Sequence, residues 1–161
     1  MPAILVDSAR VAMAEAIMAR SLHLAWGSGD PSWDTTPVPD STSETALVAE
    51  VGRRIITSAQ YCYADPNGSI QVPTGNFSPS SSSTNSIYLR FNFDFADAPT
   101  ATIRELGVFV GTTTNPSLPS GQMYFLPTDL VSPGRLLVAE RITAFTRSAN
   151  VRQAFEFVVT F

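Results

Sequence analysis

The alternation of residues 87–95 constrains the fold more than any other feature of this chain. Every second side chain is large and apolar, and the residues between them are polar or amphipathic. Successive side chains of a β-strand point to opposite faces, so this period of two predicts a strand with one packed face and one wet face, as is typical of antiparallel sheets. We expect the inward face to hold Ile87, Leu89, Phe91, Phe93 and Phe95, and the outward face to hold Tyr88, Arg90, Asn92 and Asp94.

Strand patterns also dominate the rest of the chain, after one N-terminal helix. No helical pattern interrupts the later strands, which favours a sandwich over a parallel α/β sheet. The predicted fold class is therefore mainly β, an antiparallel β-sandwich with one N-terminal α-helix, and residues 1–161 are expected to form a single domain. Further strands are expected at 47–63 (with a bulge or bend at Gly52), 102–110, 123–126, 136–142 and 151–161. Long loops are expected near 27–44, 65–86 and 111–121, the polar stretch 73–86 among them.

The predicted helix spans residues 7–20, which are rich in strong helix formers. Asp7 or Ser8 can cap it, because a side-chain oxygen there accepts from an unpaired backbone N–H of the first turn. Its apolar stripe is expected to contain Ala9, Met13, Ala16 and Ile17. So apolar a helix must pack against something. Either it covers one end of the sandwich or it docks onto a neighbouring subunit.

Charge and composition exclude several classes of function. The net charge is −4 and the pI is near 4.8, which argues against nucleic-acid binding, because nucleic-acid binders carry basic patches that neutralise phosphates. No apolar run approaches the length that crosses a bilayer, so no membrane insertion is expected, nor is a signal peptide. Cys62 is the only cysteine, which excludes an intrachain disulfide.

Residues with catalytic or metal-binding chemistry are few. His23 is the only histidine and lies in a predicted strand, so a structural role is expected for it. No serine lies in a Gly-x-Ser-x-Gly elbow. The spacing of Asp30, Asp34 and Asp40 does not match an EF-hand calcium loop. We therefore predict no catalytic residues, no cofactor and no metal site, and expect no enzyme.

The two tryptophans are expected to differ in role. Trp26 follows an apolar strand and is expected in the core. Trp33 lies between Ser32 and Asp34 in a polar loop, where a large aromatic side chain has little local reason to be. Two interpretations stay open: the ring folds back onto its own domain, or it enters a neighbour's pocket, as tryptophan commonly does at interface hot spots.

Three segments, in this order, resemble a known group of proteins. Residues 22–54 read LHLAWGSGDPSWDTTPVPDSTSETALVAEVGRR, residues 102–110 read TIRELGVFV, and residues 133–142 read PGRLLVAERI. They are similar to segments of small β-sandwich structural proteins in the tails and baseplates of contractile-tailed bacteriophages, which are related to tail-fibre and collar attachment domains.

This resemblance implies a non-enzymatic structural component of a phage tail or baseplate, assembled in the host cytoplasm and built into the virion. It would dock in fixed stoichiometry onto sheath, tube, wedge or fibre proteins, with several copies around a symmetric tail. The alternative is a tail-fibre attachment or receptor- or glycan-binding module. Such a module would need several exposed aromatic side chains on one concave face, whereas the candidates Trp33, Phe77 and Tyr88 are spread out in the sequence. The interface candidates are Trp33, Asp34, Pro37, Arg53, Arg54, Tyr88 and Arg90.

Overall fold

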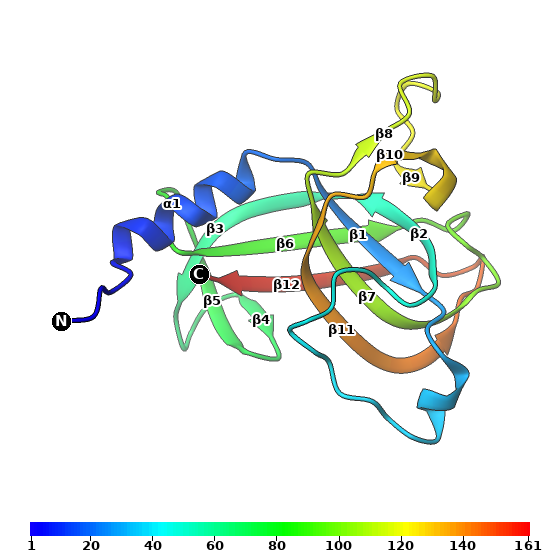
Figure 1. The fold of residues 1–161 in the computed structure, drawn as a ribbon, viewed down its shortest axis with the longest axis horizontal. Helices are drawn as coiled ribbons and strands as arrows, with labels where there is room; N and C mark the ends of the chain where they lie inside the picture. Colours follow the sequence, from blue (N-terminus) through cyan, green and yellow to red (C-terminus); the bar gives the residue numbers. More distant parts are fainter. The chain divides into compact units, whose positions relative to one another are not determined.

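The computed structural model describes residues 1–161 and confirms the mainly β class, with two five-stranded antiparallel sheets and one N-terminal helix (Figure 1). The chain divides into two compact units. The first unit consists of Met1–Arg20, Thr57–Phe91 and Ala154–Phe161, and the second of Ser21–Ile56 and Asn92–Gln153. That residues 1–161 form one domain stays a prediction.

The sheet of the first unit has the strand order β12-β6-β3-β5-β4. Antiparallel registers join β3 to β6, β3 to β5 and β4 to β5. The last two residues of β6 and the first of β12 belong to the second unit. The strands are β3 (Ser58–Ala64), β4 (Ile70–Val72), β5 (Gly75–Ser80), β6 (Ser86–Phe93) and β12 (Gln153–Thr160).

The predicted alternation along β6 holds for the four inward residues Ile87, Leu89, Phe91 and Phe93, all of which are fully buried. Two assignments are wrong. Tyr88 is buried as well, because it packs in a separate cluster with Cys62, Ile70 and Phe77. Phe95 is 42% exposed, since β6 ends at Phe93 and the chain turns away. In that turn the Asp94 carboxylate accepts the Phe95 N–H at 2.8 Å.

The predicted loop at 73–86 is also wrong in part, because β5 forms there. Only Phe77 of β5 is buried, so the strand has no apolar alternation to reveal it. It exists through backbone pairing with β3 and β4. The turn before β4 is as expected, with the Gly68 N–H donating to the Asp65 carbonyl at 2.8 Å.

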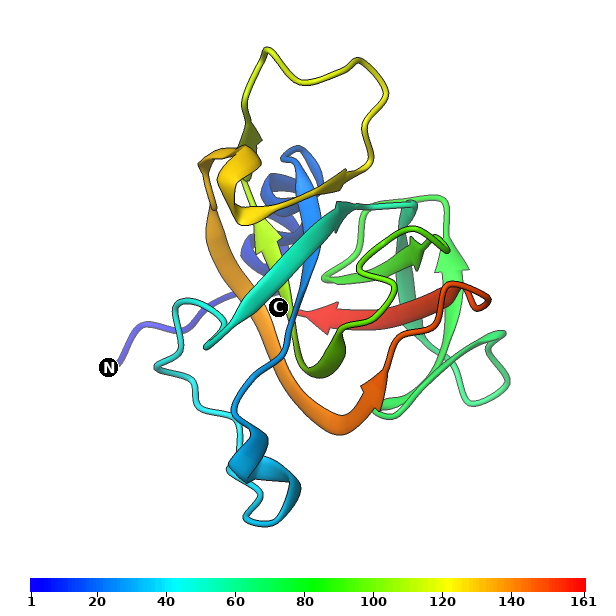
Figure 2. The ribbon, with the colours of Figure 1, turned by 90° about the vertical axis from the view of Figure 1, so that its right-hand side faces the viewer.

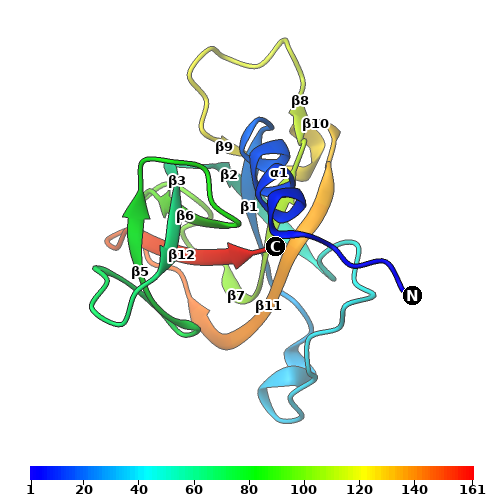
Figure 3. The ribbon, with the colours of Figure 1, turned by 90° about the vertical axis from the view of Figure 1, so that its left-hand side faces the viewer.

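The helix α1 (Asp7–Met18) belongs to the first unit and follows an extended N-terminal segment (Figure 3). Val6 occupies the N-cap position and no side chain caps the helix, so the predicted caps Asp7 and Ser8 lie inside the first turn instead. Ala14 is the buried residue of the helix, whereas Met13 of the predicted stripe is exposed. The predicted stripe is therefore confirmed only in part, because Ala9 and Ile17 are half-buried while Met13 and Ala16 are exposed.

The sheet of the second unit has the strand order β11-β7-β1-β2-β9, with a separate pair of strands, β8 and β10. The predicted strand 47–63 is divided at residues 56–57 into β2 and β3, which lie in different sheets. Its elements are β1 (Leu22–Gly27), η1 (Pro31–Asp34), β2 (Glu50–Ile55), β7 (Thr102–Val110), β8 (Thr113–Thr114), β9 (Tyr124–Phe125), η2 (Pro127–Asp129), β10 (Leu130–Ser132) and β11 (Arg135–Thr146).

The predicted irregularity at Gly52 is confirmed. Trp26 pairs with Gly52 but Gly27 pairs with Glu50, so Val51 is an extra residue in β2. A Cβ atom on Gly52 would lie 2.2 Å from the Tyr124 hydroxyl oxygen. Glycine is therefore needed there for the close approach of the Tyr124 ring.

Trp26 forms the centre of the second unit's core, which confirms its predicted role. Its ring is fully buried and stacks on Phe93 with 3.7 Å between centroids, and its Nε1 donates to the Tyr124 hydroxyl at 2.9 Å. The Arg147 guanidinium lies over the same ring at 5.0 Å. The stacked ring, the hydrogen bond and the cation above the indole each stabilise its buried position.

Candidate docking surface

The segment 28–49 leaves the end of β1, forms η1 and returns to β2 as a long excursion from the sheet (Figure 2). Its first part is held by Arg104 of β7. The Arg104 guanidinium donates to both carboxylate oxygens of Asp34, at 2.9 and 2.8 Å, and to the Ser28 carbonyl at 3.1 Å. This forked pair has the geometry of a strong charge-assisted interaction, and hydrogen bonding from Arg104 lowers the pKa of Asp34.

The middle of the segment is held by Arg141 of β11. The backbone N–H of Arg141 donates to the Asp40 carboxylate at 2.8 Å, and its guanidinium donates to the Pro39 carbonyl and the Glu44 carboxylate. The Asp40 carboxylate thus takes the place that a neighbouring strand would have beside β11, the end strand of its sheet.

The last part is held by Glu105 of β7. Its carboxylate is buried and accepts the backbone N–H groups of Ala49 at 2.8 Å and Val48 at 3.0 Å. A Cβ atom on Gly27 would lie 2.3 Å from a Glu105 carboxylate oxygen, so the glycine leaves room for this contact. The loop is therefore fixed at its beginning, middle and end by charged side chains of β7 and β11.

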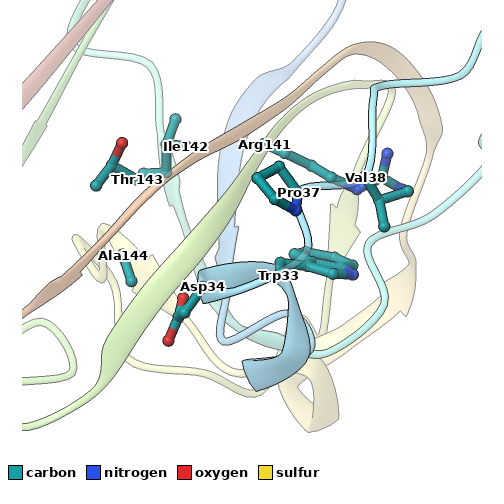
Figure 4. A pocket seen from close by; sticks show the side chains of 8 residues that line it. All are labelled: Trp33, Asp34, Pro37, Val38, Arg141, Ile142, Thr143 and Ala144. Atoms are coloured by element: carbon teal, nitrogen blue, oxygen red, sulfur yellow. The ribbon is translucent and has the colours of Figure 1, made fainter.

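A hollow of about 380 Å³ opens between this loop and β11 (Figure 4). The Trp33 ring forms one wall, where it packs closely against Gly29 and lies under the Arg141 guanidinium at 4.8 Å. The half-buried Trp33 ring folds back onto its own unit, as the first interpretation predicts, and its insertion into a neighbour's pocket stays a prediction. The lining residues are Trp33, Asp34, Pro37, Val38, Arg141, Ile142, Thr143 and Ala144.

A second hollow of about 330 Å³ lies further along the same strand. Residues Leu136–Ala139 of β11 form one side, and the polar part of the loop forms the other. We call the segment 28–49, the two hollows and residues 136–144 of β11 the loop surface. The second hollow is lined by Asp40, Ser41, Thr42, Glu44, Leu136, Leu137, Val138 and Ala139.

The structure brings only three of the predicted interface residues together here, namely Trp33, Asp34 and Pro37. Arg53 is fully buried, which corrects its assignment to an interface. Its guanidinium binds the Glu50 carboxylate at 2.7 Å and the Pro133 carbonyl at 2.7 Å. Arg54 is also engaged within the second unit, at 2.6 Å from the Asp97 carboxylate.

Tyr88 and Arg90 belong to the first unit. Tyr88 is buried, which corrects its assignment, whereas Arg90 is exposed and lies 3.6 Å from the Glu156 carboxylate. Phe77 is buried beside Tyr88. Of the aromatic residues suggested for a glycan site, only Trp33 therefore reaches the surface.

Sequence reasoning missed the three residues that hold the loop, Arg104, Glu105 and Arg141. A signal was present, since Arg104 and Glu105 lie in TIRELGVFV and Arg141 lies in PGRLLVAERI. Their partners, however, lie between 56 and 102 positions away in the sequence, and no local pattern links residues so distant.

The remaining chemistry of the chain is sparse. Both ring nitrogens of His23 are buried without a hydrogen-bond partner, and burial, followed by the charge of Arg53, lowers its pKa to about 4. No group of three or more His, Cys, Asp or Glu side chains is placed to hold a metal ion. No helix combines the length and the apolar character needed to span a bilayer.

A family model described as "Baseplate wedge 3 tail fiber network component" matches residues 2–161. Among curated proteins no sequence matches the chain. The family match extends over nearly the whole chain and confirms the resemblance to phage tail and baseplate proteins.

Proposed function

The chain belongs to the baseplate wedge 3 tail fiber network component family, and from this premise we propose that the loop surface docks it onto neighbouring baseplate proteins in fixed stoichiometry. The family is a structural component of the phage baseplate, so the protein is a non-enzymatic part of the virion tail. Its partners are accordingly other baseplate proteins.

The observation that carries the proposal is the fixed shape of the loop 28–49. Arg104, Glu105 and Arg141 hold it at three points, and Pro31, Pro37 and Pro39 restrict its backbone. A loop that is ordered before binding loses less conformational entropy when it docks, which leaves more of the contact energy as affinity. Long ordered loops on a rigid sheet are also where proteins commonly place their binding residues.

The loop surface also offers the side chains that interfaces use. Val38 is exposed at the rim of the first hollow, beside the half-buried Trp33 ring and Pro37. Aromatic and apolar groups around a concave site, with arginine nearby, are typical of interface centres. We propose that each copy contacts non-identical neighbours here, among wedge, tube, sheath or fibre proteins, and that several copies surround the symmetric tail.

The experiment that tests this proposal is incorporation into tails. A phage that lacks the gene for this protein is grown in cells that produce the Val38→Asp variant. The amount of the variant in the purified tails is then measured. The charge should reduce incorporation strongly, because an unpaired carboxylate would be buried in the interface. Val131→Asp, at another exposed valine of the same unit, is the matched control and should incorporate normally.

Normal incorporation of Val38→Asp would refute the proposed surface. Equal defects in both variants would also refute it, since they would indicate a general effect on the unit. The melting temperatures of both isolated variants should stay close to that of the original chain, because each valine is already solvent-exposed.

A further inference from the structure

The charges on the loop surface are arranged unequally between its exposed and buried parts. The Asp34 and Asp40 side chains are 42% and 46% exposed, whereas those of Arg104 and Arg141 are only 13% and 18% exposed. The guanidinium groups of Arg104 and Arg141 are mostly covered where they bind the loop 28–49, and the carboxylates of Asp34 and Asp40 are the more exposed partners. A partner therefore meets the carboxylate side of these two ion pairs and not the guanidinium side.

Glu140 adds a third carboxylate, and we call Asp34, Asp40 and Glu140 the acidic rim of the loop surface. Glu140 precedes Arg141 in β11 and retains contact with solvent. Partial desolvation and, after it, the nearby Asp40 carboxylate raise the pKa of Glu140. A positive group supplied from outside would relieve the repulsion between Glu140 and Asp40.

The apolar part of the same surface lies directly beside this rim. The first hollow has room for one large side chain, since its volume of about 380 Å³ is near the lower end for ligand sites. It runs beside Ile142, Thr143 and Ala144 of the end strand β11, directly after Arg141, whose N–H already binds Asp40, and at a register shift between β11 and β7. An extended peptide can lie along such a strand edge and place alternate side chains into adjacent pockets.

We infer that the loop surface binds an extended segment of another baseplate chain, in which a large apolar side chain enters the first hollow and adjacent Arg or Lys side chains face Asp34, Asp40 and Glu140. This inference rests on the proposed function and specifies the chemistry of the partner. Charge complementarity of this kind selects the correct partner and speeds association more than it adds affinity. Binding is accordingly sensitive to ionic strength.

The test uses the full chain and an array of short overlapping peptides that cover the other baseplate and fibre proteins of the same phage. Bound peptides should carry a large apolar residue close to Arg or Lys. Copies with Gln in place of the basic residues should bind about three- to tenfold more weakly at low salt, which corresponds to the loss of one or two exposed charge pairs. Val38→Asp should abolish binding.

Two variants separate charge from shape. In Asp40→Asn/Glu140→Gln the amide oxygen at position 40 can still accept the Arg141 N–H, so the loop keeps its anchor while two charges are removed. This variant should bind the selected peptides about three- to tenfold more weakly, with a reduced dependence on salt. Asp7→Asn/Glu15→Gln makes the same change of net charge on the exposed face of α1 and should bind unchanged.

The outcomes distinguish this inference from the proposed function. Suppose that Val38→Asp fails to enter tails, but the selected peptides lack basic residues or bind Asp40→Asn/Glu140→Gln as well as the original chain. The docking surface then stands, and recognition of basic residues by the acidic side chains is refuted. Binding of no peptide, or glycan-array binding that Val38→Asp removes, refutes it as well. Normal tail incorporation of Val38→Asp overturns the proposed function together with this inference.

Discussion

Phe93 and Phe95 are a matched pair for testing the architecture of the second unit. They stand two positions apart and have the same place in the sequence alternation, yet the first is fully buried and the second is 42% exposed. Phe93 stacks on Trp26 at 3.7 Å and contacts the Tyr124 ring edge-on at 6.2 Å. Phe95 has one described ring contact, the Arg152 guanidinium at 4.7 Å.

The two alanine substitutions should differ severalfold in their effect on the free energy of unfolding. Phe93→Ala removes a core aromatic ring and leaves a cavity against Trp26, which costs about 3–5 kcal/mol. Phe95→Ala removes a partly solvated ring and one exposed cation–π contact, which costs about 1 kcal/mol or less. Since domains are stable by about 5–15 kcal/mol, Phe93→Ala alone should remove a large share of the stability.

Urea denaturation followed by far-ultraviolet circular dichroism measures both effects without depending on tryptophan emission. Trp26 fluorescence should change in Phe93→Ala even under native conditions, because the ring stacked on the indole is lost, and should change little in Phe95→Ala. Equal losses of stability, or a larger loss for Phe95→Ala, would refute the assignment of Phe95 to a turn and the end of β6 at Phe93.

Three further predictions concern buried groups and the loop. As the pH falls from 6.5 toward 4, the free energy of unfolding should decline by up to about 1.4 kcal/mol per pH unit through His23. The reason is that the unfolded state binds a proton in this range, whereas folded His23, with a pKa of about 4, stays neutral. In a series of urea midpoints measured against pH, His23→Phe should flatten this decline. Burial raises the pKa of the Cys62 thiol to about 11, so a chromogenic disulfide reagent at pH 8 should label the folded chain very slowly and the urea-unfolded chain fast. Rapid labelling of the folded chain would contradict the burial of Cys62. Asp34→Asn removes the charge that Arg104 binds and should speed proteolytic cleavage within residues 28–49 while the melting temperature changes little; unchanged cleavage would show that this pair does not hold the loop.

Several features of the fold followed from local sequence patterns, because their physical causes are local. The period of two in residues 87–93 sets which side chains share a face, whatever the sheet later packs against. The turn at 65–68 depends on the backbone preferences of proline, asparagine and glycine. The helix depends on the propensities of residues 7–18. The family resemblance was likewise visible in short segments.

Other features depended on contacts that no local pattern contains. Phe95 continues the alternation but is exposed, because the hydrogen bonds of the 94–97 turn end the strand before it. Tyr88 occupies an outward position but is buried, because β4 and β5 bring Ile70 and Phe77 onto that face. Here the tertiary environment overrides the local preference of each side chain.

The candidate site shows the same division. The sequence identified Trp33, Asp34 and Pro37 as unusual, because a tryptophan among charges and prolines has no local explanation. It could not show that Arg104 and Arg141 hold the loop in place, since those ion pairs join residues 70 and 97 positions apart. An acidic outer surface results only when the fold buries the arginines and leaves their partners exposed. The number of charges was determined by the sequence, and their exposure was decided by the tertiary structure, because burial is a property of packing between distant segments.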